Sequence, residues 1–289
     1  MKLRRIGQVQ VSAIGLGGMP MSVQGRKSRK TSIATIHAAL DSGITLIDTA
    51  NSYTLDADGE GHNEELIAEA LASYGGDTSG VLIATKGGTI HRDEGPWGRN
   101  GRPEYLIKAA KDSARRLGVD AIGLYQFHRP DPEVPYEESL GALRELFDAG
   151  VVRHVGISNA NVEQIRTAHR VLSHAFVSVQ NQFSPVFRSS APELELCIEL
   201  DLAFLPWSPL GGIGKAGKLD KRVAAFGEVA AELGVSVQQV ALAWELHLSH
   251  LVVPIPGASR PQSITDSAKA TDLVLSPETM AFLSAARAA

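Results

Sequence analysis

Residues 44–53 read ITLIDTANSY: an apolar run typical of a buried strand ends at Asp48, and Tyr53 follows five residues later in a predicted loop. Two later apolar segments of the same kind, VLIATK and GLYQFH, end in Lys86 and His128. The carboxyl ends of neighbouring parallel strands meet at one edge of a sheet. We therefore expect an acid, a phenol, an amine and an imidazole to converge there.

Composition limits the class of protein. The chain has 289 residues, of which 44% are hydrophobic and 21% charged, a composition typical of globular proteins. Its length allows either two domains or one barrel of about 250 residues. A net charge of −4 gives no basic excess, so we expect no nucleic-acid partner. The single cysteine, Cys197, lies at helical spacing and predicts a buried thiol in a reducing compartment. Neither a signal peptide nor a membrane-spanning run is evident, and we expect a soluble cytoplasmic protein.

Strand-like apolar segments alternate with helical patterns along the chain. An alternating pattern over residues 2–18, centred on Gly7-Gln8, predicts a short N-terminal hairpin. The predicted strands cover 13–16, 44–48, 81–85, 121–127, 152–157, 176–180, 202–206 and 251–254. The predicted helices cover 31–42, 63–73, 103–118, 136–149, 161–172, 191–200, 220–233, 236–248 and 261–270.

Eight strand-helix units without a Pro/Gly-rich linker predict an α/β fold, a (β/α)8 TIM barrel preceded by a short β-hairpin, with residues 1–289 as a single domain. A doubly wound open sheet shows the same alternation and is the structural alternative, because strand order cannot be read from the sequence. In a barrel the active site lies at the carboxyl ends of the strands. Asp48, Lys86 and His128 stand at such ends.

These four side chains suggest acid-base chemistry on a carbonyl group. Taken singly, each has a structural explanation, such as turn formation, packing or solvation. Together they favour a catalytic site, in which Tyr53 gives a proton to the carbonyl oxygen and the Lys86 cation lowers the pKa of that phenol. Asp48 would hold Lys86, and His128 would orient the carbonyl. Such a site still needs a source of hydride.

Seven segments, in the order IDTANSY, ATKGG, FHRPDP, GISNAN, QNQFS, WSPLGG and PGASR, resemble the signature segments of the aldo-keto reductase superfamily. The FHRPDP segment and the short loops are closer to its bacterial branches than to the vertebrate steroid reductases. The resemblance implies a (β/α)8 barrel that binds NADPH and reduces aldehydes or ketones. It also implies a catalytic tetrad of Asp48, Tyr53, Lys86 and His128, with Tyr53 as general acid.

The same resemblance implies a cofactor site. Ser158, Asn159 and Gln180 would hydrogen-bond the nicotinamide carboxamide, and Trp207 would stack on the ring. The other implied cofactor-binding residues are Ser208, Leu210, Gly211, Lys218, Gly257, Ser259, Arg260, Gln262 and Asp266. Helix capping by Asn159 or Asn161 and core packing of Trp207 are the structural alternatives.

Preference for NADPH over NADH rests chiefly on Arg260, which can form a bidentate contact with a 2′-phosphate beside a helix N-terminus. The chain departs from the family here. Gly257-Ala258 stands where many members have Lys-Ser, Ser263 where many have Arg, and Asp266-Ser267 where Glu-Asn is common. NADPH is therefore the expected cofactor, with NADH possible.

Two other motifs suggest different chemistry. Residues 212–217 (GIGKAG) match G-x-G-x-x-G, but Leu219 stands where a P-loop needs a hydroxyl, and the motif comes too late for a Rossmann turn. A flexible loop folding over a pyrophosphate fits better. His247 and His250 are spaced as in HxxH but have no third ligand, so we expect no metal.

A small-molecule carbonyl is the expected substrate, with His91 and Trp97 of the long 87–101 loop as candidate pocket residues. Only SPETMAFLSAARAA follows the last unit, which predicts an open site of broad acceptance. Two alternative functions stay open: a Schiff-base barrel of the aldolase type using Lys86, and a non-catalytic nucleotide-sensing partner protein.

Overall fold

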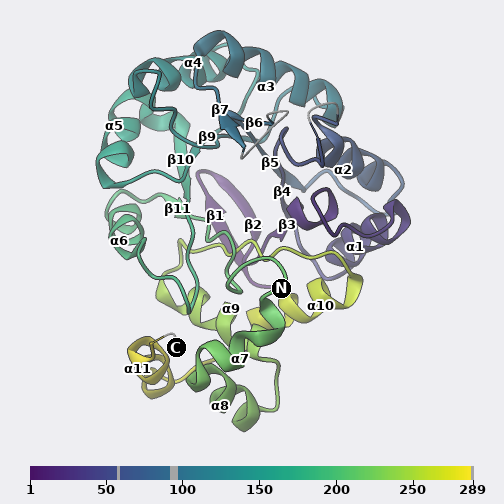
Figure 1. Ribbon diagram of the computed structural model, residues 1–289, viewed down its shortest axis with the longest axis vertical. Helices are drawn as coiled ribbons and strands as arrows, with labels where there is room; N and C mark the ends of the chain where they lie inside the picture. The colour runs from purple at the N-terminus through teal and green to yellow at the C-terminus, as the bar shows by residue number, and fades with distance from the viewer. Residues whose placement is uncertain (57–58, 92–96, 288–289) are drawn as a thin grey trace.

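The computed structural model describes residues 1–56, 59–91 and 97–287. Seven parallel strands form one sheet in the order β11-β10-β9-β8-β5-β4-β3, curled into the central ring of Figure 1. The strands are β3 (Leu16–Gly17), β4 (Leu46–Asp48), β5 (Leu82–Gly87), β8 (Leu124–Phe127), β9 (Val155–Ser158), β10 (Phe176–Gln180) and β11 (Ala203–Phe204).

Residues 251–257 close this sheet into a barrel. Parallel bridges join the segment to β11 through Val252 and to β3 through Gly257. An eighth strand is predicted at 251–254, but the segment makes only isolated bridges, because Pro254 and Pro256 lack the N–H groups that a regular ladder needs. The predicted barrel is confirmed, and the doubly wound open sheet is ruled out.

Helices surround the ring (Figure 1). They are α1 (Arg29–Asp41), α2 (His62–Ala72), α3 (Pro103–Leu117), α4 (Tyr136–Asp148), α5 (Val162–Leu172), α6 (Ala191–Glu199), α7 (Leu219–Arg222), α8 (Ala224–Leu233), α9 (Val237–Leu248), α10 (Pro261–Lys269) and α11 (Pro277–Ala285). The helix predicted at 220–233 is broken at Val223, which lies between α7 and α8. Within the described ranges, no helix combines the length and apolar character needed to span a bilayer.

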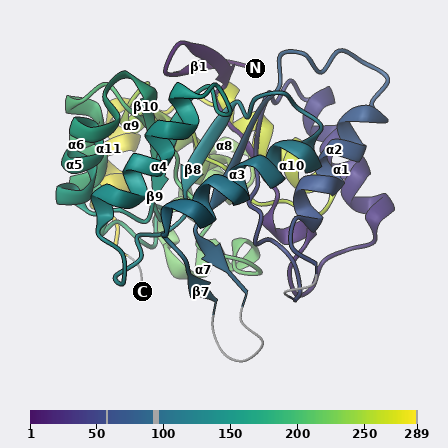
Figure 2. The same cartoon turned by 90° about the horizontal axis from the view of Figure 1, so that it is seen from above.

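Two hairpins lie at opposite ends of the barrel, as Figure 2 shows. The predicted N-terminal hairpin is present as β1 (Leu3–Ile6) and β2 (Val9–Ser12), and Gly7 in its turn adopts φ +57°. Its side chains pack against the apolar interior of the barrel and close the amino end. The second hairpin, β6 (Thr89–Ile90) with β7 (Gly98–Arg99), is not predicted from the sequence and lies at the carboxyl end.

The core has two layers. Inside the barrel, apolar side chains from successive strands fill the amino half, namely Leu46, Leu82, Leu124, Val177, Leu205 and Val253. Between strands and helices lies a larger cluster that includes Cys197, buried as predicted. Filling one half of the barrel with apolar side chains leaves the carboxyl half for polar groups.

Glu245 on α9 is an exception within the apolar core. Its side chain is fully buried, and neither carboxyl oxygen accepts a hydrogen bond from any residue within the described ranges. Burial raises the pKa of this carboxyl well above its usual value, so the folded protein holds it as the neutral acid. An unpartnered buried carboxyl destabilises the fold.

Replacing Glu245 with Leu should stabilise the protein by removing this group. Because the folded-state pKa is raised, the pH-dependent part of the penalty is absent below the unfolded pKa of about 4.3 and grows as pH rises toward the folded value, whereas the cost of burying the neutral carboxyl without a partner is present throughout. We expect a melting temperature roughly 2–6 °C higher at neutral pH, with a difference that widens from acid to neutral pH. Calorimetry across that range measures it. Glu245→Gln, close in size but not ionisable, should also lose the pH-dependent part; a wild-type pH profile in both variants would contradict the interpretation.

Candidate active site

Lys86, Asp48 and Tyr53 form a buried cluster at the carboxyl end of the barrel. The Lys86 side chain is 0% exposed, and its Nζ lies 2.7 Å from Asp48 Oδ1, 2.7 Å from the Thr49 carbonyl oxygen and 3.2 Å from Tyr53 Oη. These three contacts use all three N–H donors of the ammonium. Since Nζ donates to Tyr53 Oη, the phenolic hydrogen is left to donate elsewhere.

Burial and charge act in opposite directions on this cluster. Burial is the largest single influence and lowers the pKa of Lys86, but the charges and hydrogen bonds of Asp48 and Tyr53 together outweigh it, so the net shift is upward and the amine stays charged. Burial raises the pKa of Tyr53; Lys86 opposes this shift and Asp48 adds to it. Lys86 therefore acts to lower the pKa of Tyr53, as expected, but the net shift of that pKa is upward. Tyr53 is a neutral phenol that still carries its proton.

His128 follows β8 and completes the group of four. Its ring lies edge-on to Tyr53, with 5.8 Å between the ring centroids. Burial, with the nearby charges of Lys86 and Arg129, holds the pKa of His128 well below its usual value. Its Nδ1 is buried without a hydrogen-bond partner among the described residues. The imidazole is thus neutral at physiological pH, able to donate one hydrogen bond and accept another.

The second oxygen of Asp48 is held from the opposite side. Gln180 Nε2 donates to Asp48 Oδ2 at 2.7 Å, and Gln126 Nε2 approaches the same oxygen at 3.4 Å. Gln126 is missing from the residues predicted for the site, although an amide within the apolar strand LYQF was the available signal. Its amide adds β8 to the strands that meet at Asp48.

A cavity of about 790 Å³ opens above this cluster. Fifteen of the predicted site residues line it: Asp48, Tyr53, Trp97, His128, Ser158, Asn159, Gln180, Trp207, Ser208, Leu210, Gly257, Ser259, Arg260, Gln262 and Asp266. Lys86 lies beneath them, and Gly211, Lys218 and His91 are outside the lining. The His91 ring instead packs on Trp97, with 5.0 Å between centroids, and Trp97 lies 6.3 Å from the Tyr53 ring. Arg129, Met19 and Pro20 line the cavity without having been predicted.

Comparison with known proteins supports the resemblance noted in the sequence. The model of the aldo/keto reductase family matches residues 13–288. The chain belongs to the aldo/keto reductase family.

Similar proteins point to the same chemistry. An uncharacterised oxidoreductase of Schizosaccharomyces pombe is 35% identical to this aldo/keto reductase over 96% of the chain and 88% of the relative. An aldo/keto reductase from Klebsiella pneumoniae, solved with NADP and acetate, is 28% identical with a TM-score of 0.79 over 98% of this chain and 94% of that one. The glycerol dehydrogenase of Gluconobacter oxydans is 27% identical with a TM-score of 0.82 over the same shares. The predicted oxidoreductase class is thereby confirmed.

Polar groups around the cavity of this aldo/keto reductase are partly engaged. Ser158 Oγ donates to the Gln180 carbonyl at 2.7 Å, and Asn159 Nδ2 donates to the His128 carbonyl at 3.0 Å. No hydrogen bond from the described residues reaches Gln180 Oε1 or Asn159 Oδ1, so these oxygens are available to a ligand's N–H groups. The capping alternative applies to Asn161, which forms a capping box at the start of α5, and not to Asn159, whose φ is +57°.

Asp266, predicted to contact the cofactor, is also engaged within the protein. Its carboxylate accepts hydrogen bonds from Ser236 Oγ and Gln239 Nε2, each at 2.6 Å, and so ties α10 to the start of α9. A cofactor contact through Asp266 stays a prediction. The described residues contain no group of three or more His, Cys, Asp or Glu side chains placed to hold a metal ion.

The neutral state of His128 can be tested directly. Its ring nitrogens, observed by long-range ¹H–¹⁵N NMR and assigned through loss of the signal in His128→Gln, should not titrate between about pH 8 and pH 6, on either side of the usual value near 6.5. Because the folded pKa is lowered, the contribution of His128 to stability is full above about 6.5 and is lost as pH falls. A ring that titrates near its usual pKa would show that burial does not control it.

Proposed function

We propose that this aldo/keto reductase reduces aldehydes or ketones to alcohols by hydride transfer from NADPH, with Tyr53 as general acid. The observation that carries the proposal is the contact of Lys86 Nζ with Tyr53 Oη beneath the cavity. A charged ammonium at 3.2 Å stabilises the phenolate that forms when Tyr53 gives up its proton. Buried and neutral beforehand, Tyr53 is in the protonation state that a proton donor needs.

The other two residues of the tetrad support this proton transfer. Asp48 holds Lys86 charged and in place through a 2.7 Å ion pair. His128 is neutral and lies beside Tyr53, so its single N–H can donate to the substrate's carbonyl oxygen and orient the carbonyl toward the phenol. The roles of all four residues are part of the proposal.

The cavity fits a nicotinamide cofactor. Gln180 Oε1 and Asn159 Oδ1 can accept hydrogen bonds from the carboxamide, and the Trp207 side chain also lines the cavity. Arg260, another lining residue, precedes the first turn of α10, a suitable place for a 2′-phosphate. The relative from K. pneumoniae was solved with NADP, which supports the assignment. When bound, NADPH supplies the hydride.

A Schiff-base mechanism on Lys86 is disfavoured by the geometry. A nucleophilic amine must be uncharged and within reach of the carbonyl carbon. Lys86 is charged, is 0% exposed, and has all three donors engaged. The non-catalytic alternative, a nucleotide-sensing partner protein, leaves the ammonium-phenol pair without a purpose.

Tyr53→Phe should separate catalysis from binding. The variant removes only the hydroxyl, so cofactor affinity should stay within about twofold of wild type, whereas kcat should fall roughly 10²- to 10⁴-fold because the general acid is lost. Steady-state assays over a panel of aldehydes and ketones, with NADPH binding followed by fluorescence, measure both. Tyr74→Phe, which removes the hydroxyl of a tyrosine outside the cavity lining, is the matched control and should leave turnover unchanged. Unchanged turnover in Tyr53→Phe would refute the assignment.

Arg260→Gln should weaken discrimination between the two nicotinamide cofactors. We expect the KM for NADPH to rise roughly 10- to 100-fold, because a charge-assisted contact with the 2′-phosphate is lost, while the KM for NADH changes little. Lys269→Gln removes the same charge from the exposed end of the same helix and should leave both values unchanged. Wild-type catalytic efficiencies that are equal for NADPH and NADH would overturn the preference itself.

A further inference from the structure

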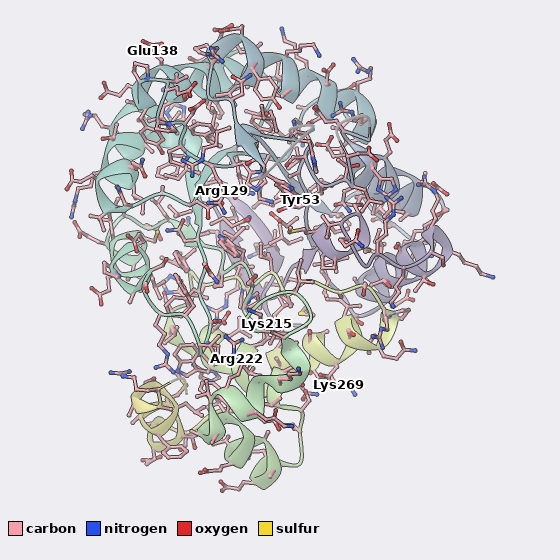
Figure 3. All side chains as sticks on the ribbon, in the orientation of Figure 1. Tyr53, Arg129, Glu138, Lys215, Arg222 and Lys269 are labelled. Carbon is pink, nitrogen blue, oxygen red and sulfur yellow. The ribbon has the colours of Figure 1, made fainter. Side chains whose placement is uncertain are left out.

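Arg129 is a cation in the cavity that the proposed reaction does not use. It follows His128 at the end of β8, is partly buried, and lines the same cavity as Tyr53 and Trp97. Figure 3 shows Arg129 next to Tyr53 near the centre of the ring. Its positive charge acts on the Tyr53 hydroxyl, lowering the pKa of that group against the effect of burial. Arg129 therefore faces the place where a substrate is reduced.

The guanidinium of Arg129 has no carboxylate partner within the described ranges. The nearest acid in sequence, Asp131, is committed to backbone N–H groups, accepting from Gly101 at 2.8 Å and from Glu133 at 3.0 Å. Partly removing a charge from water without pairing it costs free energy. An anion that binds to the guanidinium supplies the missing partner and lowers this cost.

A second guanidinium increases this cost. Arg99 of β7 donates from Nη1 to the Pro130 carbonyl at 3.1 Å, which fixes it against the residue that follows Arg129. Burial lowers the pKa of Arg129, and the charge of Arg99 lowers it further. Two guanidinium groups close enough for one charge to act on the other, neither paired with a carboxylate among the described residues, are typical of a site that binds an oxyanion.

The position of Arg129 separates it from the basic residues in and just after the 212–217 loop, which is expected to fold over the cofactor pyrophosphate. In Figure 3, Arg129 and Tyr53 lie in the upper part of the ring, whereas Lys215 and Arg222 lie below them, toward the place of α7 in Figure 1. Arg222 is engaged there, donating to the Gly211 carbonyl at 3.1 Å. Arg129 is thus placed to meet the substrate, beside the aromatic wall formed by Trp97.

We propose that Arg129, supported by Arg99, is a substrate-binding residue that selects aldehydes or ketones carrying an anionic group, a carboxylate or a phosphate. The proposal rests on the proposed carbonyl reduction and names its substrate class. The planar guanidinium can bind either oxyanion through two parallel hydrogen bonds. The carbonyl at the other end of the substrate then reaches Tyr53 and His128.

Matched pairs of substrates test the proposal on the full chain with NADPH. One pair is 4-carboxybenzaldehyde and methyl 4-formylbenzoate, alike in shape and different in charge; the other is glyceraldehyde 3-phosphate and glyceraldehyde, which distinguishes phosphate from carboxylate. We expect the wild-type protein to prefer at least one anion over its neutral partner roughly tenfold or more in kcat/KM. Arg129→Gln should remove that preference through an increase in KM for the anion, and Arg129→Lys should restore part of it. The preference should also weaken as salt is raised.

Arg102→Gln is the control for net charge, because Arg102 is an exposed arginine outside the cavity lining. It should leave every ratio unchanged. The proposal is overturned when the wild type shows no preference for either anion, or when Arg129→Gln slows both members of a pair equally. Absence of turnover with all four compounds would defeat the proposed function instead. In that case binding measured by tryptophan fluorescence still tests the anion site. The site is supported if the acid binds more tightly than the ester and Arg129→Gln abolishes the difference. Equal binding of the acid and the ester overturns it.

Discussion

The fully buried ammonium of Lys86 is the constraint on which the carboxyl half of the barrel depends. A charge without access to water must be surrounded by acceptors, and Asp48, the Thr49 carbonyl and Tyr53 supply one each. The Tyr53 loop is fixed by this requirement, since the loop must bring a phenolic oxygen to the third donor. A loop residue therefore occupies a position as well defined as those of the strand residues.

The same requirement extends across the barrel. Asp48 accepts from Lys86 through one oxygen and from Gln180 through the other, with Gln126 close by, so side chains of β4, β5, β8 and β10 meet at one carboxylate. Buried ion pairs of this kind contribute little net stability compared with apolar packing. The amino half of the barrel is filled with aliphatic side chains, and filling the carboxyl half in the same way would be the simpler solution for stability alone. A polar layer at that end is more readily explained by chemistry than by folding.

The sequence predicts those features of the site that depend on local patterns along the chain, and not those that depend on contacts between distant segments. Asp48, Lys86 and His128 stand at the ends of apolar runs, so their shared edge can be predicted once the runs are taken as parallel strands. The link between Gln126 and Asp48 depends on strand pairing, which no local pattern encodes. The upward shift of the Tyr53 pKa cannot be predicted for a related reason: the charge of Lys86 is evident from the sequence, whereas the depth at which Tyr53 is buried is not. The absence of a regular eighth strand, by contrast, can be predicted from the sequence, because the two prolines that prevent a regular ladder, Pro254 and Pro256, are evident there.

The shape of the cavity explains why a fixed charge would matter for selectivity. The last described helix, α11, packs against α8 and α9 and lies outside the ring in Figure 1, so it does not cover the cavity. A cavity of about 790 Å³ that is not covered by this helix encloses a substrate from fewer sides. Discrimination then depends more on a few directed contacts close to the reacting atoms, where a misplaced or missing group costs most. Trp97 offers an apolar surface, and Arg129 offers a charge; of the two, the charge separates substrates more sharply, because an unmatched guanidinium is left partly buried when a neutral molecule binds.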